Sequence, residues 1–182
     1  NMCIVKGRGD APYRADATRN ASYQEAVALT IRTAGIELSD DPLRTPVSGL
    51  PSDAWSVPYF RTLQDTGYNT GTIAYNADAT RVEAAKLMYA LLKKKLPAVV
   101  SDIDDAREIA SVYDDYTGFK NDEDAVRAVA TMVSNNLMIG YGAGSTFEGQ
   151  FGAYQPMTRN MLIAVMVRAA DLMDFDPCAA QE

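Results

Sequence analysis

The sequence has 182 residues, 47% hydrophobic and 23% charged, which is typical of a soluble globular protein and not of a disordered chain. The net charge of −7 disfavours nucleic acid and anionic lipid as partners, and no apolar stretch approaches the roughly 20 residues that span a bilayer. Histidine, the commonest general base and zinc ligand, is absent. We therefore expect no metal, no cofactor, no membrane insertion and no catalysis.

An internal repeat is the main signal in this sequence. The dipeptide Thr-Arg occurs three times, at Thr18-Arg19, Thr80-Arg81 and Thr158-Arg159, and each copy precedes an apolar stretch with helical spacing. The segments 13–19 and 75–81 differ at a single position. This pattern predicts three copies of a unit made of a helix, a glycine-containing loop, Thr-Arg and a second helix.

The first repeat is expected at 1–37 and is incomplete. Residues 3–7 resemble the end of a helix that would lie before Asn1, so we expect the first helix of this repeat to be missing. A helix is predicted to follow Thr18-Arg19, with its apolar face made by Ala26, Leu29 and Thr33.

The second repeat is expected at 38–97. Its first helix has an aromatic face that we expect to be core, and Gly67 is suited to the left-handed conformation that ends a helix. Its second helix begins at Thr80, which forms a predicted capping box with Glu83. The residues of the two apolar faces are Trp55, Tyr59, Phe60 and Leu63, then Ala84, Leu87, Met88, Leu91 and Leu92.

The third repeat is expected at 98–176, with a tail at 177–182. An extra helix is predicted over 104–113, and Asn136 stands where glycine ends the first helix of the second repeat. The two apolar faces comprise Ala125, Val129, Met132 and Val133, then Met161, Leu162, Val165, Met166 and Ala169.

These elements predict an all-α fold. Because a unit of two helices cannot bury its own apolar face, the three copies are expected to pack together as one module over 1–182.

The motifs resemble the S-layer homology family, whose repeat has an aromatic first helix, a glycine-rich loop and a Thr-Arg-Ala-Glu helix start. Residues 53–56 (Asp-Ala-Trp-Ser) are similar to the family's first helix, and Thr80-Arg81-Val82-Glu83 is similar to its helix start. Gly140-Tyr141-Gly142 is similar to the family's loop, although Met161 replaces the expected glutamate. The resemblance covers nearly the whole chain.

The resemblance implies a pseudo-threefold helical bundle of three helix-loop-helix repeats at the bacterial cell surface. It also implies non-covalent anchoring, by binding an anionic and commonly pyruvylated wall polysaccharide in grooves between repeats. The ligand-contacting positions that carry over are Arg19, Arg81, Arg159, Gly7, Gly71 and Gly140. Tyr141, in a glycine loop, is a further candidate.

An arginine at a helix start suits an anionic ligand, because its planar guanidinium matches a carboxylate and the helix N-terminus carries free N–H groups. The competing interpretation is structural: each arginine is a solvated charge, or ties repeats together by donating to carbonyls. Both interpretations remain open.

Two alternative functions and one covalent feature also remain open. The module could serve in the assembly of a surface layer, with other surface-layer chains as partners and no glycan binding. A hydrolase is the third hypothesis. It would need adjacent carboxylates such as Asp114-Asp115 to act as acid and base, but such pairs are usually solvated. Cys3 and Cys178 are either unrelated thiols or a disulfide that would stabilise the fold by on the order of 5 kcal/mol and indicate an extracytoplasmic location.

Overall fold

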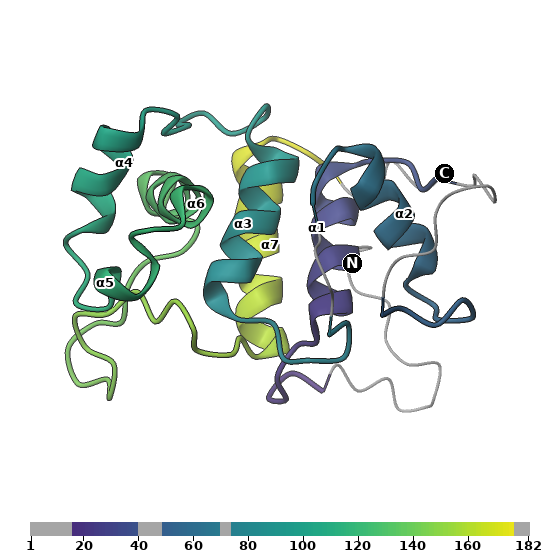
Figure 1. Ribbon diagram of the computed structural model, residues 1–182, viewed down its shortest axis with the longest axis horizontal. Coiled ribbons are helices and arrows are strands. Elements are labelled where there is room, and N and C mark those ends of the chain that lie inside the picture. The colour runs from purple at the N-terminus through teal and green to yellow at the C-terminus, as the bar shows by residue number, and fades with distance from the viewer. Residues whose placement is uncertain (1–15, 40–48, 70–73, 177–182) are drawn as a thin grey trace. The chain divides into compact units, whose positions relative to one another are not determined.

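The computed structural model describes residues 16–39, 49–69 and 74–176 (Figure 1). Within these ranges all regular secondary structure is helical and there is no β-sheet, which confirms the predicted all-α fold class. The helices in these ranges are α1 (Tyr23–Ala34), α2 (Val57–Asp65), α3 (Arg81–Leu92), α4 (Ile103–Ala110), α5 (Tyr116–Phe119), α6 (Glu123–Ser134) and α7 (Arg159–Leu172).

The chain divides into two compact units. The first unit comprises Asn1–Ala79 and Met157–Glu182 and contains α1, α2 and α7. The second unit is Thr80–Pro156 and contains α3, α4, α5 and α6.

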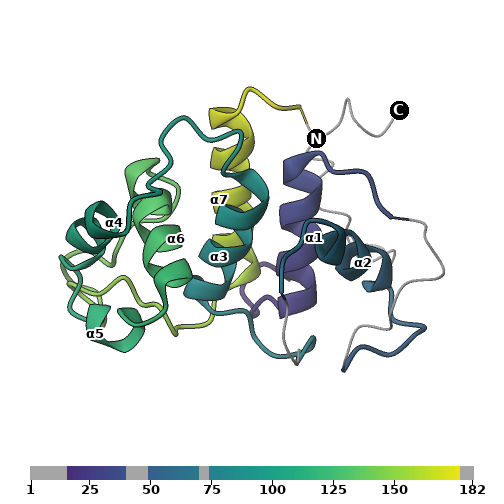
Figure 2. The ribbon, with the colours of Figure 1, turned by 45° about the horizontal axis from the view of Figure 1, so that its top comes forward.

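In the first unit, α1 packs against both α2 and α7, and Figure 2 shows α2 crossing α1. The predicted apolar face of α1 is buried, but the predicted start of this helix is wrong by one turn. Thr18-Arg19 lies before the helix, whose N-cap is Ser22, because Ser22 and Glu25 form the capping box. By position in the helix, Tyr23 and not Arg19 corresponds to Arg81 and Arg159.

The aromatic residues before and within α2 have different environments. Tyr59, Phe60 and Leu63 are buried as predicted, and Gly67 has a φ of 79° just after the helix. Trp55 was expected in the core, but 52% of it is exposed. It precedes the first turn of the helix, and its ring contacts the edge of the Tyr59 ring at a centroid distance of 6.0 Å.

In the second unit, α6 packs against α3 and α4. The predicted capping box is confirmed, since the Glu83 carboxylate accepts from the Thr80 N–H at 2.8 Å. Asn136 ends α6 with a φ of 54°, as predicted. The extra helix is also present as α4, but the one-turn helix α5 was not predicted. This helix buries Phe119. Because the helix contains a glycine, no helical signal could be recognised in the sequence at this position.

Backbone hydrogen bonds in the first unit join three distant segments into a ring. Ala21 N–H donates to Met157 C=O at 2.8 Å, Ala79 N–H to Ala21 C=O at 2.8 Å, and Met157 N–H to Ala79 C=O at 2.9 Å. Each of these residues directly precedes the N-cap of a helix, namely α1, α3 and α7. The three loops therefore correspond residue by residue, although the pseudo-threefold arrangement of the helices stays a prediction.

Candidate functional site

The first backbone N–H groups of α1, α3 and α7 already have acceptors. In α3, the Arg81 and Val82 N–H groups donate to the carbonyls of Gln155 and Ala153 at 3.0 and 2.9 Å, and the Glu83 N–H reaches the Thr80 hydroxyl at 3.3 Å. The corresponding N–H groups of α1 and α7 donate to Ala77, Tyr75, Arg19 and Ala17. The free helix-start amides that the sequence argument assumed are therefore not available to a ligand, and any anion site must be made by side chains.

Arg81 is the first residue of α3 and is only 5% exposed. Its guanidinium donates from Nε to the Phe151 carbonyl at 2.8 Å and from Nη2 to the Ile139 carbonyl at 2.7 Å. The rings of Tyr141 and Phe151 each lie 4.9 Å from its Cζ. This geometry fixes the guanidinium between two aromatic rings and two neutral acceptors.

The charge of Arg81 has no carboxylate partner among the described residues. It is the one charged residue in that part of the chain that is buried, and it forms no ion pair there. Burial lowers the pKa of its guanidinium, an effect that the nearby Asp115 carboxylate only partly opposes. Nη1 has no acceptor in the described part and is not among the fully buried atoms, so this nitrogen reaches solvent.

The loop that surrounds Arg81 is held by the turn 113–115, between α4 and α5. The Asp115 carboxylate accepts from the N–H groups of Phe151 and Ala153, both at 2.8 Å. Asp114 N–H donates to the Gly149 carbonyl at 3.1 Å, and the Tyr113 ring contacts the Phe151 ring at a centroid distance of 5.6 Å. This turn therefore positions the carbonyl and the ring that contact Arg81.

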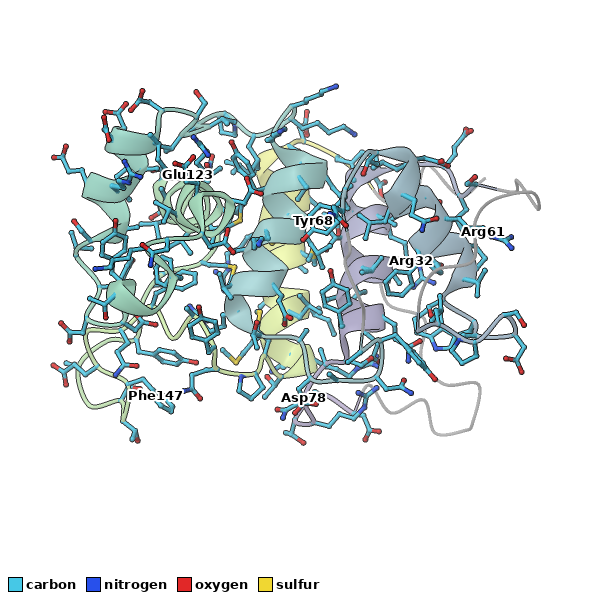
Figure 3. The ribbon with its side chains drawn as sticks, viewed as in Figure 1. Arg32, Arg61, Tyr68, Asp78, Glu123 and Phe147 are labelled. Carbon is cyan, nitrogen blue, oxygen red and sulfur yellow. The ribbon has the colours of Figure 1, made fainter. Side chains whose placement is uncertain are left out.

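Tyr141 and two glycines complete the site. Tyr141 is half-buried, and its ring contacts both the Arg81 guanidinium and the ring of Phe147, which is labelled in Figure 3 and lies at a centroid distance of 5.4 Å. A Cβ at Gly140 would collide with the Tyr113 ring, and one at Gly152, where φ is 74°, would collide with the Tyr141 ring. Both glycines are thus required by close packing around the arginine.

The other two motif arginines meet in the first unit, where they share one carboxylate. Arg19 donates from Nη1 and Nη2 to the two oxygens of Glu25, at 2.8 and 2.5 Å. Arg159 also donates to Glu25, from Nη1. The Arg159 side chain is 15% exposed and its Nε is buried without a partner in the described structure, whereas the Arg19 side chain is 37% exposed.

Several acidic groups surround this cluster. Burial by itself raises the pKa of Glu25, but the hydrogen bonds from Arg19 and the Ser22 N–H, together with the charge of Arg159, leave it below its usual value. Asp16 lies 3.8 Å from Nε of Arg19, and the charge of Asp78 also acts on Arg19. The two guanidinium groups are therefore already paired with carboxylates of the protein itself.

A second aromatic surface lies on the first unit. Exposed Trp55 contacts Tyr59, and the Tyr59 hydroxyl accepts at 2.9 Å from Nε of Arg32, the residue labelled in Figure 3. The Arg32 guanidinium also lies 5.0 Å from the centre of the Tyr59 ring. This arrangement leaves the Trp55 ring accessible as a platform for a sugar or an apolar ligand.

The structure gathers the predicted site residues into two groups. Arg81, Gly140 and Tyr141 lie together in the second unit, and Arg19 and Arg159 lie together in the first. Gly7, Gly71, Cys3 and Cys178 lie outside the described residues. Sequence reasoning treated Asp114-Asp115 as a solvated pair and so missed Asp115, for which the sequence offered no signal.

A scan against protein-family models and a search of curated proteins gave no match to this chain. Across the described ranges, no helix is both long and apolar enough to cross a membrane. The same residues contain no group of three acidic or cysteine side chains arranged to hold a metal ion. The features that bear on function are therefore the Arg81 site and the cluster of Arg19 and Arg159 around Glu25.

Proposed function

We propose that this protein is a non-catalytic anchoring module of the bacterial cell surface, related to S-layer homology domains, that binds an anionic wall polysaccharide. The observation that carries the proposal is Arg81, a buried cation without a carboxylate partner in the described structure. A buried charge that is held only by neutral acceptors is costly to the fold and favours an incoming anion.

The surroundings of Arg81 suit an acidic sugar. Nη1 has no acceptor in the described structure and can still donate, and a charge-assisted bond to a carboxylate is roughly twice as strong as a neutral one. The half-buried ring of Tyr141 offers an apolar face beside this donor. A sugar ring that stacks on Tyr141 would bring its carboxylate to Arg81.

Sedimentation with purified bacterial wall tests this proposal. The wild-type chain should bind untreated wall and lose binding after hydrofluoric acid strips acid-labile polymers from it. Arg81→Gln should weaken binding by about tenfold or more, because one charge-assisted bond is lost. Arg61→Gln is the matched control: Arg61 is half-exposed on α2, and the same charge is removed far along the chain from the site.

Tyr141→Ala is a second variant that tests the site even if Arg81→Gln does not fold. This substitution removes a half-exposed ring but leaves both carbonyl contacts of Arg81, and it should weaken binding several-fold. Circular dichroism and thermal melting establish that each variant is folded. Full binding by folded Arg81→Gln and Tyr141→Ala would eliminate this site.

The second candidate function is surface-layer assembly without glycan binding. It is favoured by the pairing of both Arg19 and Arg159 with Glu25, whose carboxylate occupies the position that an anionic ligand would take between those two arginines. Exposed Val112 and Ile139, at 71% and 60%, offer apolar contacts for another chain. Binding to neither wall preparation, together with concentration-dependent association in sedimentation velocity, would support this function instead.

A further inference from the structure

We propose that Arg19 and Arg159 form a second carboxylate-binding site, which the Glu25 side chain occupies as an internal ligand and so closes. Its use by a polysaccharide rests on the proposed function, whereas its affinity for a simple carboxylate does not. The site lies wholly in the first unit.

The geometry around Glu25 is that of a bound carboxylate. Both of its oxygens accept from Arg19, in the fork-to-fork arrangement that guanidinium groups make with acidic ligands. Arg159 approaches the same carboxylate from a position 134 residues away in the sequence. A surface ion pair needs only one arginine for a carboxylate, whereas Glu25 is bound by two.

Comparison with Glu83 separates this role from helix capping. Glu25 and Glu83 occupy the same position in α1 and α3, and each accepts from the backbone N–H of its N-cap, Ser22 or Thr80, at 2.9 or 2.8 Å. The Glu83 carboxylate also accepts from the Thr80 hydroxyl, and within the described residues it forms no ion pair with an arginine. The guanidinium contacts are therefore specific to Glu25.

The donors of this site are not fully used by Glu25. Nε of Arg159 is buried and has no acceptor in the described structure, although Nη1 of the same group is bound. An unsatisfied buried donor costs free energy, and a freely placed carboxylate could satisfy it where the tethered one does not. Asp16 and Asp78 limit the excess positive charge, so a singly charged carboxylate suits the site better than a phosphate.

Chemical rescue tests the inference without any polysaccharide. Glu25→Ala should lower the Tm, because it removes a cap acceptor and leaves two guanidinium groups near each other. Formate, which matches the deleted carboxylate, should restore at least half of the loss, while chloride at equal ionic strength should not. Wild type should show no specific response to formate.

Glu83→Ala is the matched control, because it removes the same capping bond from a carboxylate that pairs with no arginine in the described structure. Its Tm should also fall but should not respond to formate. An equal response of both variants, or none in Glu25→Ala, would overturn the inference.

A second variant covers the case in which Glu25→Ala does not fold. Glu25→Gln keeps an acceptor for the Ser22 N–H while removing the negative charge. It should bind D-glucuronate at least tenfold more tightly than wild type in calorimetry, and an unchanged affinity would reject the closed site. Loss of the Arg81 site would leave this result unaffected, so the two proposals fail independently.

Discussion

At the scale of single residues, Asp115 is the side chain whose role is clearest. Its two oxygens accept the N–H groups of Phe151 and Ala153, and Phe151 in turn supplies a carbonyl and a ring to Arg81. Asp115→Asn replaces one acceptor oxygen by a donor that faces an N–H group. We expect the free energy of unfolding to fall by about 1–3 kcal/mol, the usual cost of leaving a buried donor unsatisfied.

Asp114→Asn is the control for this prediction. The backbone N–H of Asp114 donates to the Gly149 carbonyl, and this hydrogen bond is preserved in the variant. Urea unfolding at neutral pH should show a change of a few tenths of a kcal/mol, as at ordinary surface positions. Equal effects of the two substitutions would show that the carboxylate of Asp115 does not hold the loop. Wall binding should weaken with Asp115→Asn alone.

The residue scale also shows where sequence reasoning reaches its limit. The chemistry of Arg81 as an anion-binding group follows from its type and motif, but its burial depends on Phe151 and Tyr141, which lie in a loop distant in the sequence. Similarly, Asp115 looks identical in sequence to the exposed Asp114 beside it. Only tertiary contacts decide which carboxylate accepts loop amides.

At the scale of elements, local signals predicted the helices well. The Thr80–Glu83 capping box and the left-handed Asn136 depend on interactions within a few residues, so both could be recognised from sequence. The start of α1 was misplaced because Thr18-Arg19 repeats the dipeptide of the other helix starts, while the actual cap is Ser22. A repeated dipeptide is thus a weaker boundary signal than a serine or threonine followed three residues later by glutamate.

The loop after α6 offers a paired test at the same scale. A Cβ at Gly140 would collide with the Tyr113 ring, whereas a Cβ at Gly142 would meet no atom within 4 Å. Gly140→Ala should therefore destabilise the protein by about 1–3 kcal/mol, as overpacking does, and weaken wall binding. Gly142→Ala should leave both properties nearly unchanged, and Tm measurements on the two variants check this.

Comparable Tm values for the two variants would mean that the Tyr113 ring moves aside without cost. In that event the loop would not depend on the turn 113–115 for its position, and the effect expected for Asp115→Asn should also be small. The Gly140→Ala and Asp115→Asn variants therefore both test whether the turn 113–115 positions the loop.

At the scale of the whole molecule, the ring of Ala21, Ala79 and Met157 links the beginning, middle and end of the described chain. Such contacts join residues that are far apart in the sequence. The entropy cost of closing the intervening loops is therefore offset only when the fold is complete. All three residues are fully buried. We expect their amides to open only in global unfolding, and hence to be among the most protected from hydrogen exchange.

Native-state hydrogen exchange followed by NMR checks this expectation. The Ala21, Ala79 and Met157 amides should exchange with the free energy of global unfolding, and urea should lower that free energy with the slope of the global transition. The Tyr141 amide, which bonds within its own loop to the Gln150 carbonyl, should exchange through smaller openings. Exchange of the three ring amides as fast as Tyr141 would show that the loops separate while the helices persist, and the ring would then be a consequence of helix packing and not a constraint on it.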